Sequence, residues 1–247
     1  MKTRKDLPSF GYLRDIKVDI NALLNHCIQQ ELLDPDKYNS IQVKNKTGYE
    51  DFIKMNHNHC HDYIMSANED CENMESYKQL ALTEFDESKR TGNVFESTPT
   101  TVLHRSKRID PSRASYVPEA DEHNYGVRNS LVTGEIEKLL DMFTSSVKRV
   151  RFAYMKEHHK FGAHRDYDPS YLTRYHIPLI TNPGVIFFAK DNHGIERSLH
   201  LPADGRIYFL NAGHLHWVHN NSDQGRVHLI VDVHGQKELE NLEELNF

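Results

Sequence analysis

Residues 174–188 of this chain have the sequence RYHIPLITNPGVIFF. Two runs rich in β-branched and aromatic residues, Arg174–Ile180 and Val185–Ala189, lie on either side of Asn182-Pro183-Gly184. Asn, Pro and Gly are the residues that tight turns favour, because they tolerate the backbone angles of a turn. The stretch therefore predicts two β-strands joined by a short connection.

The same pattern continues on both sides of this stretch. Short runs of strand-forming residues follow one another, separated by segments rich in Gly, Pro, Asn and Asp; they are Val150–Met155, Ser198–Leu201, Ile207–Leu210 and Arg226–Val233. Several short strands at such regular spacing predict an antiparallel sandwich or barrel.

The chain before residue 146 has a different pattern. Asp19 can cap a helix whose apolar face continues to Leu32, and a second helix is predicted from Thr133. Between residues 88 and 126, three prolines interrupt any periodicity, so this part is predicted to be irregular.

We therefore expect three segments that fold together as one domain. Residues 1–145 form a helical and irregular region that supports or covers the core, and residues 146–236 form the β-core. Residues 237–247 form a short C-terminal helix, because Leu239, Leu242 and Leu245 have the spacing of one apolar face.

Composition excludes several classes of protein. Hydrophobic residues make up 38% of the 247 residues, which permits a packed core, but no apolar run approaches the ~20 residues that span a bilayer. The N-terminus has no apolar stretch of the kind that a signal peptide contains, and three widely spaced cysteines favour a reducing compartment. We expect a cytoplasmic protein with no membrane partner. A formal charge of −6 also removes the general attraction to nucleic acid, and no nucleic-acid partner is expected.

Histidine is abundant, with 17 residues, and His164-Arg165-Asp166 is the most informative local pattern. On a strand, residues i and i+2 point to the same face, so this imidazole and this carboxylate can converge on one metal ion. Two histidines and one carboxylate leave open coordination positions, as in non-haem Fe(II) oxygenases. A third ligand from a later strand is needed, and composition does not choose among His214, His216 and His219.

Three further polar residues stand at the beginnings of apolar strands. Arg226 opens one strand, and a buried cation there requires an anion, for which the planar fork of arginine suits a carboxylate. Arg174 and His176 form a same-face pair at the start of another strand. Together with the metal pair, they predict a pocket for a small polyanion beside a metal.

A second histidine cluster is a weaker candidate. His57, His59 and His61 alternate around Cys60 and could bind zinc. A structural zinc site usually has two ligand pairs at defined spacing, and the only later cysteine, Cys71, has no neighbouring partner. A solvated loop is the favoured interpretation, and the role of this cluster stays open.

Three blocks, in order, resemble the aspartyl/asparaginyl β-hydroxylase family: residues 174–188, Leu201–Asn211 and Arg226–Val233. The resemblance covers roughly residues 150–233. It implies a mainly β fold with α: a double-stranded β-helix core, the cupin-like jelly roll, with an N-terminal helical layer.

The resemblance also implies roles for individual residues. His164 and Asp166 resemble the first two metal-ligand positions of the family, and the histidine ten residues before the cosubstrate arginine is His216. Arg226 resembles the arginine that pairs with the distal carboxylate of 2-oxoglutarate. Arg174 and His176 match an Arg-x-His pair near that cosubstrate.

The implied chemistry uses Fe(II), 2-oxoglutarate as cosubstrate and O2. The enzyme would hydroxylate a C–H bond of an amino acid, an amino-acid side chain or a similar small polar substrate, free or in a peptide, with release of succinate and CO2. Two alternatives stay open: a cupin-fold metalloenzyme that does not use 2-oxoglutarate, and a non-catalytic jelly-roll binding module.

The irregular segment before the core has a local positive charge. Residues 88–118 include six basic and two acidic residues. A long irregular loop in a compact domain is usually a binding loop, a lid or disordered. One interpretation is a solvated loop; the other is a lid that folds over the mouth of the barrel and holds an acidic group of the substrate.

Overall fold

The computed structural model describes residues 1–40, 77–90, 112, 118 and 121–245. Its helices are α1 (Ile20–Gln29) and α4 (Gly134–Asp141), with short 3-10 helices at Pro35–Lys37, Glu87–Lys89, Glu122–Asn124 and Lys237–Asn241. Its strands are β1 (Phe10–Lys17), β2 (Asn39–Ser40), β3 (Tyr77–Ala81), β4 (Thr83–Glu84), β5 (Val127–Arg128), β6 (Ser146–Met155), β7 (Lys160–His164), β8 (Thr173–Ile180), β9 (Val185–Lys190), β10 (Glu196–Leu199), β11 (Arg206–Leu210), β12 (Leu215–Asn220), β13 (Arg226–His234) and β14 (Leu242–Glu244).

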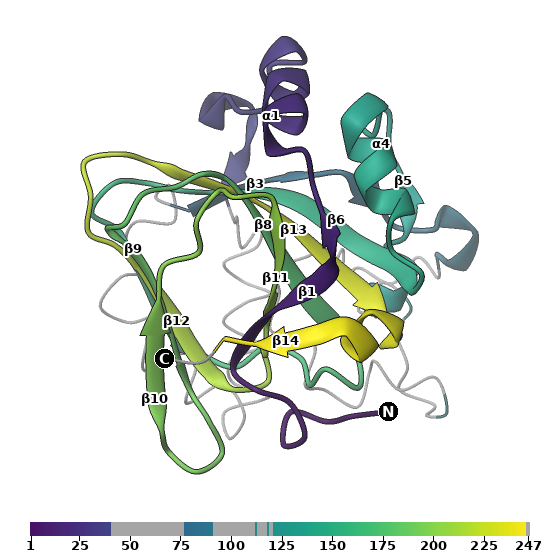
Figure 1. Ribbon diagram of the computed structural model, residues 1–247. Coiled ribbons are helices and arrows are strands. Elements are labelled where there is room, and N and C mark those ends of the chain that lie inside the picture. The colour runs from purple at the N-terminus through teal and green to yellow at the C-terminus, as the bar shows by residue number, and fades with distance from the viewer. Residues whose placement is uncertain (41–76, 91–111, 113–117, 119–120, 246–247) are drawn as a thin grey trace, which may run out of the picture.

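Two antiparallel sheets face each other and form the core (Figure 1). Strands β11, β8, β13 and β6 are neighbours in the large sheet, and β10, β9, β12 and β7 make the small sheet in that order. Strands β6–β13 pass between the two sheets in the order that defines a double-stranded β-helix. The predicted fold class, a mainly β jelly roll with helices, is therefore confirmed.

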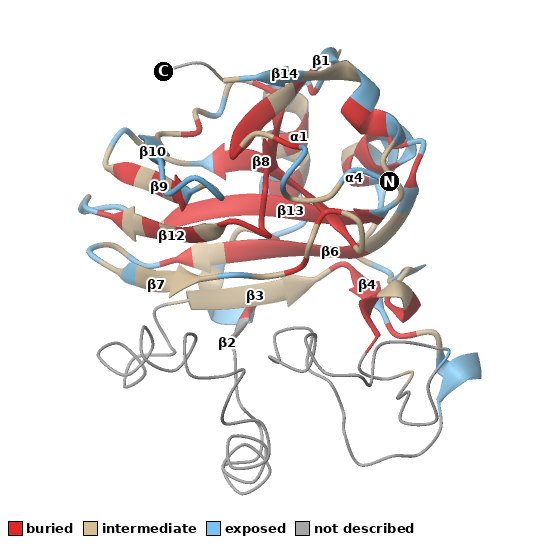
Figure 2. Ribbon diagram, turned by 90° about the horizontal axis from the view of Figure 1, so that it is seen from below, coloured by how far each residue is buried: buried red, intermediate tan, exposed pale blue. Residues whose placement is uncertain are grey.

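The central strands of the large sheet are buried on both faces (Figure 2). On β13, Val227, Leu229, Val231 and Val233 belong to the hydrophobic cluster on the outer face of the sheet. The alternate residues of β13 face the small sheet, since side chains of a strand alternate between faces. Among these, Arg226 and Ile230 line a pocket.

The two predicted helices cover the outer face of the large sheet (Figure 1). The side chain of Asp19 accepts a hydrogen bond of 3.0 Å from the amide of Ala22, which confirms it as the cap of α1. Leu23 and Cys27 of α1 and three residues of α4 are buried against the sheet; those of α4 are Ile136, Leu139 and Leu140. Burial of these apolar side chains is the main interaction that holds the two helices against the sheet.

The prediction of a helical N-terminal region is wrong for residues 10–17, which form β1. This strand pairs with β11 and extends the large sheet. It also pairs with β14, at Gly11–Leu13. A Cβ at Gly11 would lie 2.7 Å from the carbonyl oxygen of Glu243, so glycine allows the close approach of β14.

The C-terminal helix was also predicted wrongly. Residues Lys237–Asn241 form a short 3-10 helix, and Leu242–Glu244 form strand β14. The leucine spacing fits a helix, but the free edge of β1 offers backbone hydrogen bonds that a strand can satisfy. Tertiary pairing therefore overrides the local pattern.

Two structural predictions lie outside the described residues. These are the cluster around Cys60 and most of the lid segment, residues 91–111 and 113–117. Among the residues that the structure describes, no helix is both long and apolar enough to cross a membrane.

The turn before β11 generates a stability prediction. Gly205 has a φ of +84°, and an added Cβ would lie 2.4 Å from the carbonyl oxygen of Val18. Gly194 has a similar φ of +81°, but its nearest neighbour would be 3.8 Å away. Gly194→Ala should therefore lower the free energy of unfolding by about 1–2 kcal/mol, the cost of a left-handed backbone for a residue with a Cβ. Gly205→Ala should lower it by a further ~1–3 kcal/mol through the clash.

Urea denaturation of the two variants measures this difference. Equal losses in the free energy of unfolding would show that the contact with Val18 relaxes freely.

Candidate active site

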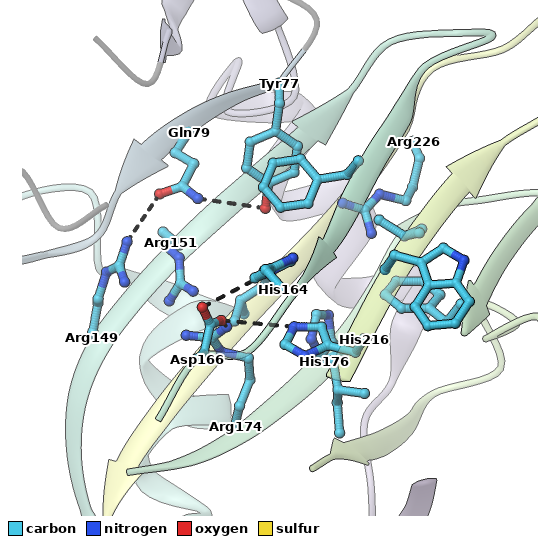
Figure 3. A pocket seen from close by; sticks show the side chains of 16 residues that line it. Tyr77, Gln79, Arg149, Arg151, His164, Asp166, Arg174, His176, His216 and Arg226 are labelled. Carbon is cyan, nitrogen blue, oxygen red and sulfur yellow. Dashed lines mark hydrogen bonds and ion pairs between the residues drawn. The ribbon is translucent and has the colours of Figure 1, made fainter. Parts of the chain in front are cut away.

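Three of the predicted site residues meet at the mouth of the barrel (Figure 3). His164 ends β7, Asp166 follows two residues later, and His216 is the second residue of β12. Strands β7 and β12 pair with His216 directly opposite His164. One ligand atom from each of the three residues lies within 4.8 Å of the others. The Nε2 atoms of His164 and His216 lie 3.8 and 3.9 Å from the carboxylate oxygens of Asp166.

Backbone contacts fix which nitrogen of each imidazole faces this centre. Nδ1 of His164 lies 2.8 Å from the carbonyl oxygen of Gly162, and Nδ1 of His216 lies 3.0 Å from that of His214. A carbonyl oxygen only accepts hydrogen bonds, so Nδ1 carries the proton in both rings. The lone pair of each Nε2 is then available to a metal.

The charge state of His216 suits the same role. Burial, followed by the neighbouring His164, lowers the pKa of His216 to about 3. Its imidazole is therefore neutral near pH 7, which is the form that binds a metal.

Asp166 differs from the prediction in one respect. It lies beyond the end of β7, so it does not reach the centre by strand alternation. Its amide donates a hydrogen bond of 2.8 Å to the carbonyl oxygen of Ala212, in the connection between β11 and β12. The turn that leads to His216 thus holds the backbone of Asp166.

The structure separates the three histidines that the sequence left open. His216 and Val218 are buried on the inner face of β12. His214 is turned away, because its imidazole contacts the hydroxyl of Ser9 at 3.0 Å and the carbonyl oxygen of Arg4 at 3.0 Å. His219 lies against the ring of Phe188.

Arg226 lies in the same pocket and is 1% exposed. Its Nε and Nη1 have no hydrogen-bond partner among the described residues. Its guanidinium lies over the ring of Phe187, at 5.4 Å from the ring centroid. Burial lowers the pKa of Arg226, and the phenol of Tyr77 opposes this effect. A buried guanidinium with unused donors is suited to a carboxylate ligand.

Arg174 and His176 also line this pocket. Nη1 of Arg174 contacts Oδ2 of Asp166, and its Nε donates to Asp232 at 2.8 Å. The ring nitrogens of His176 have no partner among the described residues. Burial, followed by Arg174 and Arg226, keeps the pKa of His176 well below its ordinary value.

The sequence analysis missed a buried charge network behind the site. Asp232 accepts hydrogen bonds from Arg174 and, at 2.8 Å, from Arg151. Arg149 donates to Glu122 at 2.9 Å. The signal was present on β6, where two arginines alternate in a strand that is otherwise largely apolar. Asp232 is thus the partner of Arg151 and Arg174.

The pocket joins these groups between the two sheets. It is also lined by polar residues of β3 and by apolar residues of both sheets, namely Tyr77, Gln79, Phe161, Phe187, Leu210, Trp217, Val218 and Ile230. Its walls therefore combine the three candidate metal ligands, cationic groups and apolar side chains.

Asp232 should be essential for stability. Burial raises its pKa, but Arg174 and Arg151 overcome this effect and hold the pKa below its ordinary value. Asp232→Asn removes the buried anion that Arg151 and Arg174 share, so it should lower the free energy of unfolding by about 3–5 kcal/mol. The exposed pair of Asp141 with Arg128 provides the control, and Asp141→Asn should lose at most ~1 kcal/mol.

Urea denaturation near pH 7 tests both variants. Because the pKa of Asp232 is depressed in the folded state, its stabilisation is present above about pH 4 and is lost as the pH falls further. A loss below about 1 kcal/mol for Asp232→Asn would contradict this assignment.

Comparison with solved structures gives weak likenesses. An oxidoreductase of the 2OG-Fe(II) oxygenase family from Burkholderia pseudomallei matches 41% of this chain and 59% of its own, with 17% identity and a TM-score of 0.34. A Pseudomonas putida prolyl-4-hydroxylase matches 40% of this chain and 56% of its own, with 17% identity and a TM-score of 0.30. A cupin domain from Bordetella pertussis matches 37% of this chain and 85% of its own, with 18% identity and a TM-score of 0.28.

This chain thus spans less than two thirds of the length of the two oxygenases, and no assignment rests on these likenesses. The sequence matches no curated protein.

The family comparison is more informative. The family model described as Aspartyl/Asparaginyl beta-hydroxylase matches residues 124–235. This range contains strands β6–β13 and all six residues that the sequence analysis selected. Over residues 124–235, which are slightly less than half of the chain, this protein is thus similar to the aspartyl/asparaginyl beta-hydroxylase family.

Proposed function

We propose that this protein is an Fe(II)- and 2-oxoglutarate-dependent dioxygenase that hydroxylates a C–H bond of an amino acid, an amino-acid side chain or a similar small polar substrate. The substrate is a free amino acid, a residue in a peptide or a similar small polar molecule. The observation that carries the proposal is the arrangement of His164, Asp166 and His216 in one pocket with the unsatisfied guanidinium of Arg226.

The donor set fits iron. Two imidazoles with Nε2 available and one carboxylate are the ligands of non-haem Fe(II) oxygenases, and they leave positions open for other ligands. The contact of Arg174 with Asp166 would orient the carboxylate, and the carbonyl groups beside His164 and His216 would orient the rings. Fe(II) would therefore be held by His164, Asp166 and His216.

The rest of the pocket fits a dicarboxylate cosubstrate. Arg226 would pair with the distal carboxylate of 2-oxoglutarate, since its Nε and Nη1 are unused among the described residues. Arg174 and His176 would line the pocket beside the cosubstrate. When bound, iron, 2-oxoglutarate and O2 together supply an oxidant that adds one oxygen atom to the substrate, while succinate and CO2 leave.

The chain contributes binding, orientation and exclusion of water. Phe161, Phe187 and Val218 form apolar walls around the polar groups. In such a low-dielectric pocket, charge-assisted hydrogen bonds are stronger than in water, and side reactions with water are suppressed.

The family name indicates aspartyl and asparaginyl side chains as the first substrates to test. Succinate formation from 2-oxoglutarate, with Fe(II) and with or without aspartate- and asparagine-containing peptides and free amino acids, is the direct assay. A cupin-fold metalloenzyme that does not use 2-oxoglutarate, or a binding module without catalysis, would give no succinate.

The metal site generates one prediction. His216→Ala should abolish tight Fe(II) binding and activity, because it removes a neutral imidazole ligand. His219→Ala is the matched control, since His219 is on the same strand as His216 but its ring lies against Phe188 of β9. Calorimetric titration of anaerobic protein with Fe(II) measures the affinity.

Retained Fe(II) affinity in His216→Ala, together with its loss in His219→Ala, would show that the distal ligand is wrongly assigned.

The cosubstrate site generates another prediction. Arg226→Ala removes a desolvated, charge-assisted pair worth ~2–5 kcal/mol, so the KM for 2-oxoglutarate should rise by about 30-fold or more. Arg206→Ala is the control, because Arg206 is half-exposed and pairs with Asp204. Steady-state succinate formation measures both, and an unchanged KM for Arg226→Ala is incompatible with the proposed role.

A further inference from the structure

Strand β3 brings two polar residues into the pocket from outside the family-matched range. Tyr77 and Gln79 lie two residues apart on β3, and both line the pocket (Figure 3). Strand β3 pairs with β6 and thereby extends the large sheet beyond the jelly roll. The N-terminal region therefore contributes directly to the site.

The strand register explains how Tyr77 reaches Arg226. Tyr77 on β3 and Arg226 on β13 are both paired with Met155 of β6, one from each side. Directly paired residues share a face of the sheet, and strands two apart are separated by about 9.5 Å. A tyrosine and an arginine are long enough to span that distance together, so their polar ends meet over Met155. In agreement with this, the phenol of Tyr77 raises the pKa of Arg226, against the larger effect of burial.

The direction of each hydrogen bond around Tyr77 can be assigned. Arg149 is only a donor, so the Gln79 atom 3.3 Å from its Nη2 is the carbonyl oxygen Oε1. The amide nitrogen of Gln79 must then face Tyr77, and it donates to the phenol oxygen at 3.5 Å. Arg226 is also only a donor. Gln79 therefore donates to the phenol oxygen, and neither Gln79 Nε2 nor Arg226 can accept the hydrogen of the phenol.

The phenol is also held in place relative to the metal strand. The ring of Tyr77 lies 4.9 Å from that of Phe161, measured between centroids. Phe161 is on β7, three residues before His164. The position of the hydroxyl is thus set by both sheets.

We propose that Tyr77 is a cosubstrate-binding residue whose O–H donates to the distal carboxylate of 2-oxoglutarate, alongside Nε and Nη1 of Arg226. Three donors then converge on one carboxylate, and the phenol hydrogen gains the acceptor that Gln79 and Arg226 do not provide. This assignment rests on the proposed function. It also means that the cosubstrate site is incomplete without β3.

The test compares two 2-oxoacids that differ at the distal end. 2-Oxoglutarate has the distal carboxylate and 2-oxovalerate lacks it, while both retain the 2-oxoacid group. Tyr77→Phe keeps the ring packing against Phe161 and removes only the hydroxyl. The dissociation constant for 2-oxoglutarate should rise about ten- to 100-fold, as for loss of a hydrogen bond to a charged group, and that for 2-oxovalerate should stay unchanged.

Calorimetric titration of anaerobic, Fe(II)-loaded protein gives both constants. Tyr154→Phe is the matched control: Tyr154 is on β6, one residue from Met155, and packs against the cluster on the outer face of the sheet. It should bind both 2-oxoacids as the wild type does.

The outcomes separate the two proposals. Wild-type protein that does not bind 2-oxoglutarate would overturn the proposed function together with this assignment. Wild-type binding that Tyr77→Phe leaves unchanged or strengthens would overturn the role of Tyr77 alone. An equal loss for both 2-oxoacids would also overturn it, because a general distortion does not distinguish the distal carboxylate.

Discussion

The structure depends on one constraint: the central strands of the large sheet are buried on both faces. Helices α1 and α4 cover one face, and the small sheet covers the other. Side-chain alternation then sends aliphatic residues of β13 toward the helices and the intervening residues toward the barrel interior. A register slip of one residue would exchange the two sets, so the hydrophobic outer cluster fixes the direction of every functional side chain on these strands.

A buried interior with charged groups is stable only if those charges are compensated. Asp232 neutralises Arg151 and Arg174, and Glu122 pairs with Arg149. The pattern at Arg226 is different, since two of its donors have no partner among the described residues. The difference separates charges that hold the structure together from a charge that is suited to a ligand.

The pairing of β7 with β12 brings the candidate metal ligands together. His164 and His216 are opposite each other in this pair, although they are 52 positions apart in the chain. Asp166 joins them through the hydrogen bond of its backbone to the turn before β12. On the other side of the pocket, β3 adds Tyr77 and Gln79. The site is thus assembled from segments distant in the chain that the two sheets bring together.

Much of this could be predicted from the sequence. The run of residues 174–188 was sufficient to predict two strands of a β-core. The cap at Asp19 predicted one helix, and the apolar pattern after Thr133 predicted the other. The motif around His164 and the positions of Arg226, Arg174 and His176 also carried a local signal, because polar residues at the ends of apolar strands need a chemical reason.

The sequence alone did not determine β1, β14, the network of Asp232 or the contribution of Tyr77. Strands β1 and β14 form because sheet edges offer hydrogen bonds, which the leucine spacing of the tail does not reveal. Tyr77 meets Arg226 because both are paired with Met155 across three strands that are distant in the chain. Local residue patterns determine which face a side chain takes, whereas its partners depend on long-range strand register, and only the folded tertiary structure establishes that register.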